Sequence, residues 1–203
     1  MRAHVPTPLD LDLFDSKAWL AVVPFWMSGI RNRGLPPVPG ISRFPELNVR
    51  TYVRYRDKPG VYFFSLDAAS ALAVWGARTF FHLPYFHADM ECREVNGEVN
   101  YHSLRRHGSA QFDARYRPTN PVQLGAPGTI ENWLTERYCL FTVANNTVYR
   151  CDIHHPQWPL QNASADVITN TMSDAAGLRQ PQDAPLLHFS KRLDVLIWPL
   201  QRA

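Results

Sequence analysis

Histidine and cysteine side chains could hold a metal ion, but their spacing in this chain is not that of a metal site. The sequence contains eight histidines and three cysteines. Zinc sites usually show H-E-x-x-H, another pair of histidines one helical turn apart, or paired C-x-x-C motifs, and none of these patterns occurs. We therefore expect no bound metal and interpret the histidines as ordinary polar side chains. The histidines closest to one another in the sequence are His82, His87, His102, His107 and the pair His154-His155.

Motifs for nucleophilic and nucleotide chemistry are also missing. The chain has no G-x-S-x-G elbow, no phosphate-binding loop and no dinucleotide-binding fingerprint. No cofactor is therefore expected. Any chemistry would have to come from single acidic, basic or phenolic side chains in a pocket.

Length and composition predict one globular domain. The chain has 203 residues, of which 45% are hydrophobic and 19% charged, with six Trp, eight Tyr and eleven Phe. This length suffices for one well-buried core and is short for two. The aromatic content favours β-structure. We expect a single domain over residues 1–203.

The net charge of +3 comes almost wholly from arginine, because Lys17, Lys58 and Lys191 are the only lysines. The arginines are scattered and form no basic run of the kind that follows a phosphate backbone. We therefore expect no nucleic-acid partner.

Cysteine count and apolar runs indicate a reducing, aqueous compartment. Cys92, Cys139 and Cys151 are odd in number and lack paired spacing, so no disulfide framework is predicted. The start of the chain has no basic-then-apolar signal pattern, and the longest apolar run, 19–27, is far too short to cross a bilayer. We expect a cytoplasmic protein with no membrane partner.

A first hairpin and a helix are predicted in the middle of the chain. Residues 47–55 alternate, with Asn48 and Arg50 on the polar face, and residues 57–60 form a turn into a second strand, 61–66. Asp67 can cap a following helix that contains Leu72, Trp75 and Thr79. Pro84 then returns the chain to an extended structure.

A second hairpin is predicted about Asn96-Gly97, the preferred two-residue turn. Folding about this turn places Glu91 opposite His102, Cys92 opposite Tyr101, and Asp89 diagonal to Arg106. One face carries Phe86, Ala88, Met90 and Cys92, whereas the other carries His87, Asp89, Glu91 and Arg93.

Further elements are a short helix over 130–137 and strands over 138–143 and 193–200. Residues 31–45 hold four prolines and no periodic pattern. A loop of this length serves either as a lid over a site or as a rigid connection.

Six segments, in order along the chain, resemble the YqjF-like family of uncharacterised bacterial proteins, which shares the acetoacetate decarboxylase-like fold. The segments are AWLAVVPFWMSGIRNRGLPPVPG, FPELNVRTYV, residues 60–88, LTERYCLFT, HHPQWPLQNA and KRLDVLIWPL. The resemblance implies an α+β, mainly β, fold: an antiparallel β-barrel with a small cone-like sheet and a few helices around an apolar pocket.

Relatives in this superfamily usually begin with a further helix and strand. The chain starts almost directly at the segment that follows, so either its start is misplaced or the barrel lacks its first strand. In the decarboxylases that strand supplies an arginine to the pocket, and no residue here is assigned that role.

The lysines of the decarboxylases have no counterpart. Those enzymes carry Gly-Arg-Glu at a helix end and then Gly-Tyr-Pro-Lys-Lys, whose first lysine forms a Schiff base. The matching residues are Gly76-Ala77-Arg78 and then residues 82–86, HLPYF. Tyr85 replaces the first lysine, so the resemblance predicts that this chain does not act through an iminium intermediate.

The same resemblance selects candidate catalytic residues. Glu46 matches a pocket glutamate and would be a general acid or base with a raised pKa; alternatively, it pairs with a nearby arginine. Arg78 could hold a carboxylate, or only cap helix carbonyls. Tyr85 could donate a hydrogen bond, although alternation places it on the charged face of the second hairpin. The expected ligand-binding residues are Trp75, His82 and Phe86.

Three functions remain open from the sequence. The protein is an acid/base enzyme acting on a small carbonyl or carboxylate compound, a non-catalytic ligand carrier or sensor with an apolar pocket, or an oligomerisation module. A small-molecule ligand is the expected partner, with a homo-oligomer as a further possibility. Convergence of Glu46, Arg78 and Tyr85 on a cavity would favour the first function.

Overall fold

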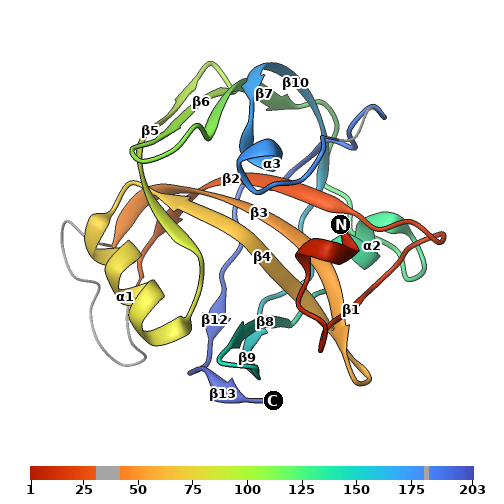
Figure 1. The fold of residues 1–203 in the computed structure, drawn as a ribbon. Helices are drawn as coiled ribbons and strands as arrows, with labels where there is room; N and C mark the ends of the chain where they lie inside the picture. The colour runs from red at the N-terminus through yellow and green to blue at the C-terminus, as the bar shows by residue number, and fades with distance from the viewer. Residues whose placement is uncertain (31–41, 181–182) are drawn as a thin grey trace.

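The computed structural model describes residues 1–30, 42–180 and 183–203, which form mainly β-structure with a few short helices (Figure 1). The strands are β1 (Asp10–Leu11), β2 (Leu20–Ser28), β3 (Arg43–Tyr55), β4 (Lys58–Ala68), β5 (Tyr85–Val95), β6 (Glu98–Arg105), β7 (Gln111–Pro118), β8 (Cys139–Ala144), β9 (Thr147–His154), β10 (Gln161–Asn170), β11 (His188–Phe189), β12 (Leu196–Ile197) and β13 (Gln201–Arg202). The helices are a 3-10 turn at Arg2–His4, α1 (Ala71–Phe81), α2 (Ile130–Thr135) and α3 (Met172–Ala175). The predominance of strands agrees with the predicted class.

Strand pairing follows the order β11-β10-β7-β6-β5-β4-β8-β9-β12, and β3 joins this path by pairing with β4, β2 and β1. In Figure 1, β5, β6, β7 and β10 lie above the long β3 and β4 strands, whereas β8, β9 and β13 lie below them. Among the described residues the path does not return to its first strand, so the predicted barrel is not confirmed. Strand β4 also runs parallel to β5 and β8, so the sheet is not wholly antiparallel as expected.

The β3–β4 hairpin turns earlier than predicted. Tyr55 pairs with Lys58, so the turn consists of Arg56 and Asp57, and Pro59 and Gly60 already belong to β4. Arg56 takes the positive φ that the tight turn requires, at 53°. Proline and glycine at 59–60 were therefore misleading turn signals. They lie in a strand whose pairing with β3 continues past them.

Strand β3 is buried on both faces. Residues 44–49 and 51–53 are all buried, so the polar face predicted from alternation points into the molecule. On one side, Leu47 and Val49 pack on Tyr101 and Phe112 of β6 and β7. On the other side, Tyr52 contributes to a second core that also contains Phe63, Leu66, Leu83 and Leu140. The β3–β4 hairpin thus separates two hydrophobic cores.

Helix α1 connects β4 to β5 and confirms the predicted strand-helix-strand unit. Its cap is Ser70, whose hydroxyl accepts a hydrogen bond from the Ala73 amide at 3.3 Å, and not Asp67 as predicted. Asp67 lies fully buried in β4, where Arg105 binds it instead. The helix ends at His82, in the left-handed conformation, before Pro84 leads into β5.

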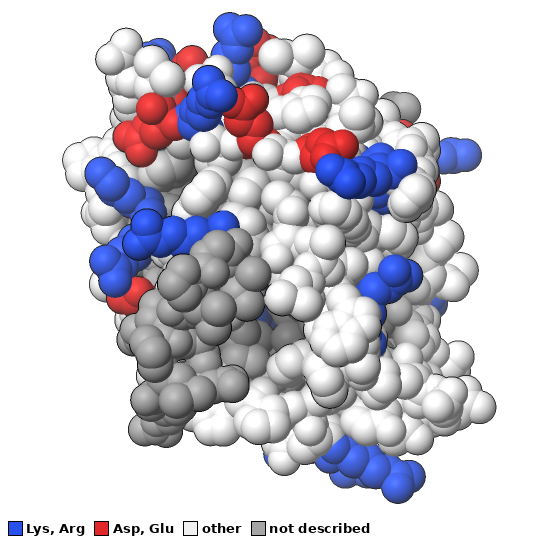
Figure 2. Space-filling view, turned by 90° about the vertical axis from the view of Figure 1, so that its left-hand side faces the viewer, with Lys and Arg blue, Asp and Glu red and all other residues white. Residues whose placement is uncertain are grey.

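The second hairpin is confirmed in detail. Glu91 lies opposite His102 and Cys92 opposite Tyr101, with Asn96 and Gly97 both at positive φ in the turn. The Arg106 guanidinium donates to the Asp89 carboxylate at 2.8 and 2.9 Å. In Figure 2 acidic and basic side chains are interspersed near the top of the molecule, where this hairpin lies in Figure 1.

The remaining elements differ in extent from the predictions. Helix α2 covers most of 130–137, and β8 matches the strand predicted at 138–143. Residues 193–200 form only the two-residue strand β12, which pairs with β9, and most of this segment is exposed. Residues 31–41 of the expected lid or connection lie outside the described ranges, and Arg43–Pro45 are part of β3. No helix in the described ranges is long and apolar enough to cross a membrane.

Candidate functional site

The Glu46 side chain is buried between strands and has few polar neighbours in the described ranges. It is 3% exposed, and its neighbours across β2 and β4 are Phe25 and Ala68. The Tyr85 hydroxyl lies 3.1 Å from each carboxylate oxygen and donates to the carboxylate. No basic side chain in the described ranges lies within 4.0 Å of the carboxylate. An arginine partner, the alternative considered from the sequence, is therefore not found there.

Burial determines the protonation state of this pair. Desolvation raises the pKa of Glu46 to about 8, although the Tyr85 hydrogen bond acts in the opposite direction. Burial and the neighbouring carboxylate raise the pKa of Tyr85 well above its usual value. At neutral pH Glu46 is therefore mostly a neutral acid, which can donate a hydrogen bond or a proton.

Tyr85 reaches this interior site despite its parity with the charged face of β5. Residues Tyr85 to His87 pair with β4 in the body of the molecule, whereas residues from Ala88 onward pair with β6. The strand passes from one part of the sheet to the other, so residues of one parity are interior at its start and exposed further on. The exposed, charged face of β5 therefore begins at Asp89, beyond the residues that lie near Glu46.

Two further polar side chains share the inward face of β3 with Glu46. Asn48 is 5% exposed, and its amide oxygen has no hydrogen-bond partner among the described residues. The Arg50 Nε is also buried and lacks a partner in the same ranges. Their neighbours across β2 and β4 are apolar: Val23 and Leu66 beside Asn48, and Ala21 and Phe63 beside Arg50. Alternation identified both residues as polar-face positions but gave no sign that this face is interior.

Arg78, the third predicted catalytic residue, does not join Glu46 and Tyr85. Its guanidinium lies 5.9 Å from the centre of the Phe86 ring. Phe86 points to the other side of the strand from Tyr85, where Arg105 stacks on it at 3.7 Å while bound to Asp67. The structure therefore brings two of the three predicted catalytic residues together.

Arg78 and His82 instead share a separate pocket of about 360 Å³ where β4, β5 and β8 diverge. Its other lining residues include Tyr62, Leu83 and Thr142. The Thr142 hydroxyl donates to the backbone carbonyl of His82 at 2.8 Å and fixes the end of α1. Trp75, the other predicted ligand contact on this helix, is 60% exposed and packs edge-on against Phe80.

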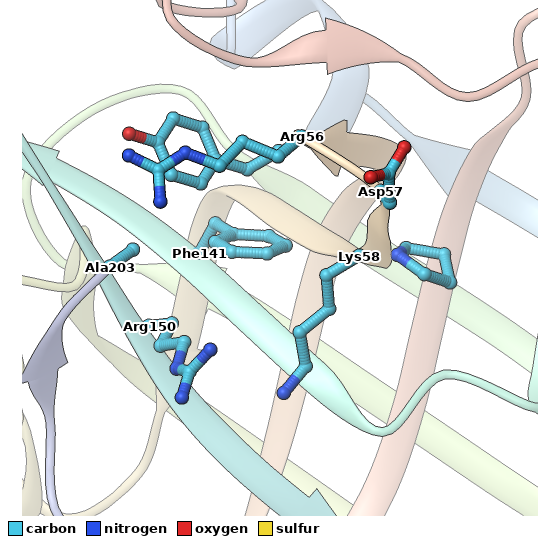
Figure 3. Close-up of a pocket in the computed structure, with 8 residues that line it drawn as sticks. Arg56, Asp57, Lys58, Phe141, Arg150 and Ala203 are labelled. Carbon is cyan, nitrogen blue, oxygen red and sulfur yellow. The ribbon is translucent and has the colours of Figure 1, made fainter.

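A larger pocket, of about 460 Å³, lies where the β3–β4 turn meets β8 and β9 (Figure 3). Its lining includes Arg56, Lys58, Phe141 and Arg150. The Lys58 ammonium is 2.5 Å from the Asp152 carboxylate, and Arg150 lies 3.9 Å from the same group. The ion pair with Asp152 holds the Lys58 ammonium, and Phe141, which also lines this pocket, is only 1% exposed.

Candidate metal ligands do not gather elsewhere in the described ranges. No group of three or more His, Cys, Asp or Glu residues there could surround a metal ion. His102 bonds Asp113 at 2.5 Å, and His155 lies beside backbone carbonyls.

Comparison with known proteins identifies the family. The model of DUF2071, described as an uncharacterized conserved protein, matches residues 1–194. The chain belongs to this family. It is also 49% identical, over all 203 residues, to the uncharacterized protein YqjF of Bacillus subtilis (strain 168), 84% of which the match covers.

Solved structures with this fold are acetoacetate decarboxylases and related enzymes. The chain aligns over its full length with 78% of acetoacetate decarboxylase from Legionella pneumophila, at a TM-score of 0.65 and 12% identity. It aligns over 99% of its length with 80% of the enduracididine biosynthesis enzyme MppR in complex with pyruvate, at a TM-score of 0.59 and 12% identity. At such low identity these similarities establish the fold alone.

Proposed function

We propose that the protein binds a small carbonyl- or carboxylate-bearing compound at Glu46 and Tyr85, and acts on it by acid/base chemistry without a Schiff base. The observation that carries this proposal is the buried Glu46 carboxyl, whose pKa of about 8 makes it a neutral acid at physiological pH. Isolated buried acids of this kind cost stability and are concentrated at functional sites.

The chemistry follows from the two groups. Protonated Glu46 can donate to a ligand carbonyl oxygen, while the Tyr85 hydroxyl keeps the carboxyl in position. In its ionised form, the same carboxylate can take a proton from the carbon next to that carbonyl. One side chain could thus catalyse enolisation in both directions.

The proposed chemistry does not use a lysine amine. Tyr85 stands where the decarboxylase pattern has its reactive lysine. Lys17 and Lys191 are exposed, and Lys58 is bound to Asp152. The proposed substrate class is supported by fold neighbours that are acetoacetate decarboxylases or that were solved with pyruvate.

A non-catalytic ligand-binding protein is the second candidate. Arg78 lies away from Glu46 and Tyr85, so the full set of three predicted catalytic groups does not converge. Such a protein would use the same inward face of β3 to bind a ligand and would leave it unchanged.

Two measurements test and separate these functions. Binding of acetoacetate and pyruvate is measured by calorimetry at pH 6.5 for the unaltered protein, Glu46→Gln and Tyr85→Phe, with the exposed Glu91→Gln as the matched control. We expect binding that weakens in the two site variants and persists in the control. Equal binding by Glu46→Gln, or no binding of either compound by the unaltered protein, would overturn the proposal.

Catalysis is tested by following deuterium uptake from D₂O into the methyl groups of the same compounds by NMR. An enzyme that transfers protons through Glu46 accelerates uptake, and Glu46→Gln abolishes the acceleration. Binding without accelerated exchange supports the second candidate instead.

A further inference from the structure

The inward face of β3 carries a row of three polar side chains, of which Asn48 and Arg50 have a buried atom without a hydrogen-bond partner in the described ranges. Glu46, Asn48 and Arg50 occupy successive inward positions, and β3 pairs with β2 without interruption through all three. The irregularity in the hairpin lies in β4, where Phe64 is the extra residue, so the three side chains of β3 keep the same parity.

Arg50 has no acidic partner. No Asp or Glu lies within 4.0 Å of its guanidinium in the described ranges, and residues 31–41 and 181–182 include no acidic residue. Its nearest aromatic contact is weak, with the Tyr52 ring centre 5.9 Å from the guanidinium carbon. Arg50 is half-buried, and its buried Nε has no hydrogen-bond partner in the described ranges, a cost that a bound anion would offset.

Asn48 adds a second unsatisfied group between Arg50 and Glu46. Its buried side-chain oxygen accepts no hydrogen bond from any residue that the structure describes. Such a group costs about 1–3 kcal/mol when left unpaired. A ligand that brought an anionic group to Arg50 and a donor or water to Asn48 would relieve both costs.

We propose that Arg50 binds the anionic end of the ligand whose carbonyl contacts Glu46, with a water or a ligand donor on the Asn48 oxygen between them, so that the ligand is an oxo acid with separated functional groups. This inference rests on the proposed function and makes it more specific. It assigns Arg50 to the anionic end and the Asn48 oxygen to a donor or water, and it excludes neutral ketones as preferred ligands.

Strand geometry sets the length of this ligand. The α-carbons of Glu46 and Arg50 are four residues apart, or about 13 Å along an extended strand. A 2-oxo acid has its carboxylate and carbonyl on adjacent carbons, so it cannot contact both side chains unless Arg50 leans several ångströms along the strand. A 4-oxo acid, with two carbons between the groups, fits the spacing better.

A series of probes tests the assignment. Calorimetry compares pyruvate, acetoacetate and levulinate, in which zero, one and two carbons separate the carbonyl from the carboxylate, with 2-pentanone as a neutral ketone. We expect affinity to increase from pyruvate to levulinate and 2-pentanone to bind more weakly than levulinate. Arg50→Met should weaken levulinate binding about tenfold or more, because a charge-assisted hydrogen bond is lost.

The matched control is Arg115→Gln, an exposed arginine on β7, which should leave levulinate binding unchanged. Thermal unfolding without ligand gives an independent readout. If Arg50 serves the ligand and not the scaffold, Arg50→Met should leave Tm unchanged or raise it, because the variant removes a half-buried cation that has no acidic partner in the described ranges.

Several outcomes would overturn the inference. Levulinate binding that is lost in Glu46→Gln but kept in Arg50→Met would leave the proposed function standing and remove Arg50 from the site. A lower Tm for Arg50→Met would assign the arginine to the scaffold. Tightest binding of pyruvate would refute the spacing argument.

Discussion

Two buried carboxyl groups lie one residue apart in the β3–β4 ladder, on opposite faces of the hairpin. Glu46 pairs with Ala68, and the adjacent pair is Leu47 with Asp67. Asp67 is fully buried and accepts two hydrogen bonds from Arg105, at 2.6 and 3.0 Å. Glu46 is nearly as buried, but among the described residues its carboxylate has only the Tyr85 hydroxyl as a side-chain partner. The two acids are thus similarly buried and differ in their partners.

This difference separates scaffold from candidate site. Burial raises the pKa of Asp67, but the Arg105 hydrogen bonds and charge oppose that rise, and the pair joins β4 to β6. Burial raises the pKa of Glu46 with one weak opposing contact. A buried acid with a bidentate cation joins two strands as an ion pair, whereas one without a cation is mostly protonated at neutral pH.

The largest effect should come from breaking the scaffold pair. Asp67→Asn leaves the buried Arg105 charge uncompensated, so unfolding free energy should fall by about 3–5 kcal/mol in urea at pH 7. The control is Asp89→Asn, whose partner Arg106 is exposed; it should cost at most about 1 kcal/mol. Equal losses in both variants would show that Asp67 is not part of the scaffold.

The pH dependence of stability should reveal the raised pKa of Glu46. Its pKa is higher in the folded than in the unfolded protein, so its contribution to stability is complete below pH 4.5 and declines until about pH 8. Relative to Glu46→Gln, the unaltered protein should lose about 3 kcal/mol between pH 4.5 and 7. Parallel urea denaturation series provide the measurement. A constant difference between the two proteins would mean that Glu46 titrates normally.

Removing the Tyr85 hydroxyl should have a smaller effect. Tyr85→Phe loses one hydrogen bond to the carboxyl and should cost about 0.5–1.5 kcal/mol. Because this bond lowers the pKa of Glu46, the stability loss with pH should also extend above pH 8. Tyr138→Phe, which removes an exposed hydroxyl bonded to Glu136, is the control and should leave the pH window unchanged. If the pH range of the stability loss is unchanged in Tyr85→Phe, the Tyr85 hydrogen bond does not influence the pKa of Glu46.

The smallest expected effect is none. Borohydride treatment with acetoacetate or pyruvate should leave the protein mass unchanged, because the resemblance to the decarboxylases matches Tyr85, and no lysine, to their reactive lysine. Mass spectrometry after proteolysis is the measurement. A stoichiometric adduct on Lys17, Lys58 or Lys191 would contradict the proposal.

Local chemistry was predictable where a short segment determines its own structure. Asn96-Gly97 fixes the turn by its backbone preferences, so the register of the second hairpin followed from the sequence. The Asp67 prediction failed because its partner Arg105 is 38 positions away, and no local pattern reports such a pair. The prediction of a turn at residues 59–60 failed for the opposite reason, because strand pairing overrides the usual turn preference of proline and glycine.

The candidate site was partly predictable. Glu46 and Tyr85 were selected by resemblance to a family pattern, and the structure places them in contact. Arg50 and Asn48 lay on a polar face that alternation assigns to solvent in a two-layer sheet. Only the presence of packed elements on both sides of β3 makes that face interior, and this depends on contacts distant in the sequence.

The parallel contact between β4 and β8 has a consequence for how the chain folds. The β3–β4 and β5–β6 hairpins each close a two-residue turn, but Val61 and Leu140 are about 80 residues apart. Loop-closure entropy makes such a contact late to form, and non-local strand pairing slows folding. The region around β8 should therefore assemble last, on hairpins that have already folded. Its amide hydrogens should be among the first to exchange when the sheet opens.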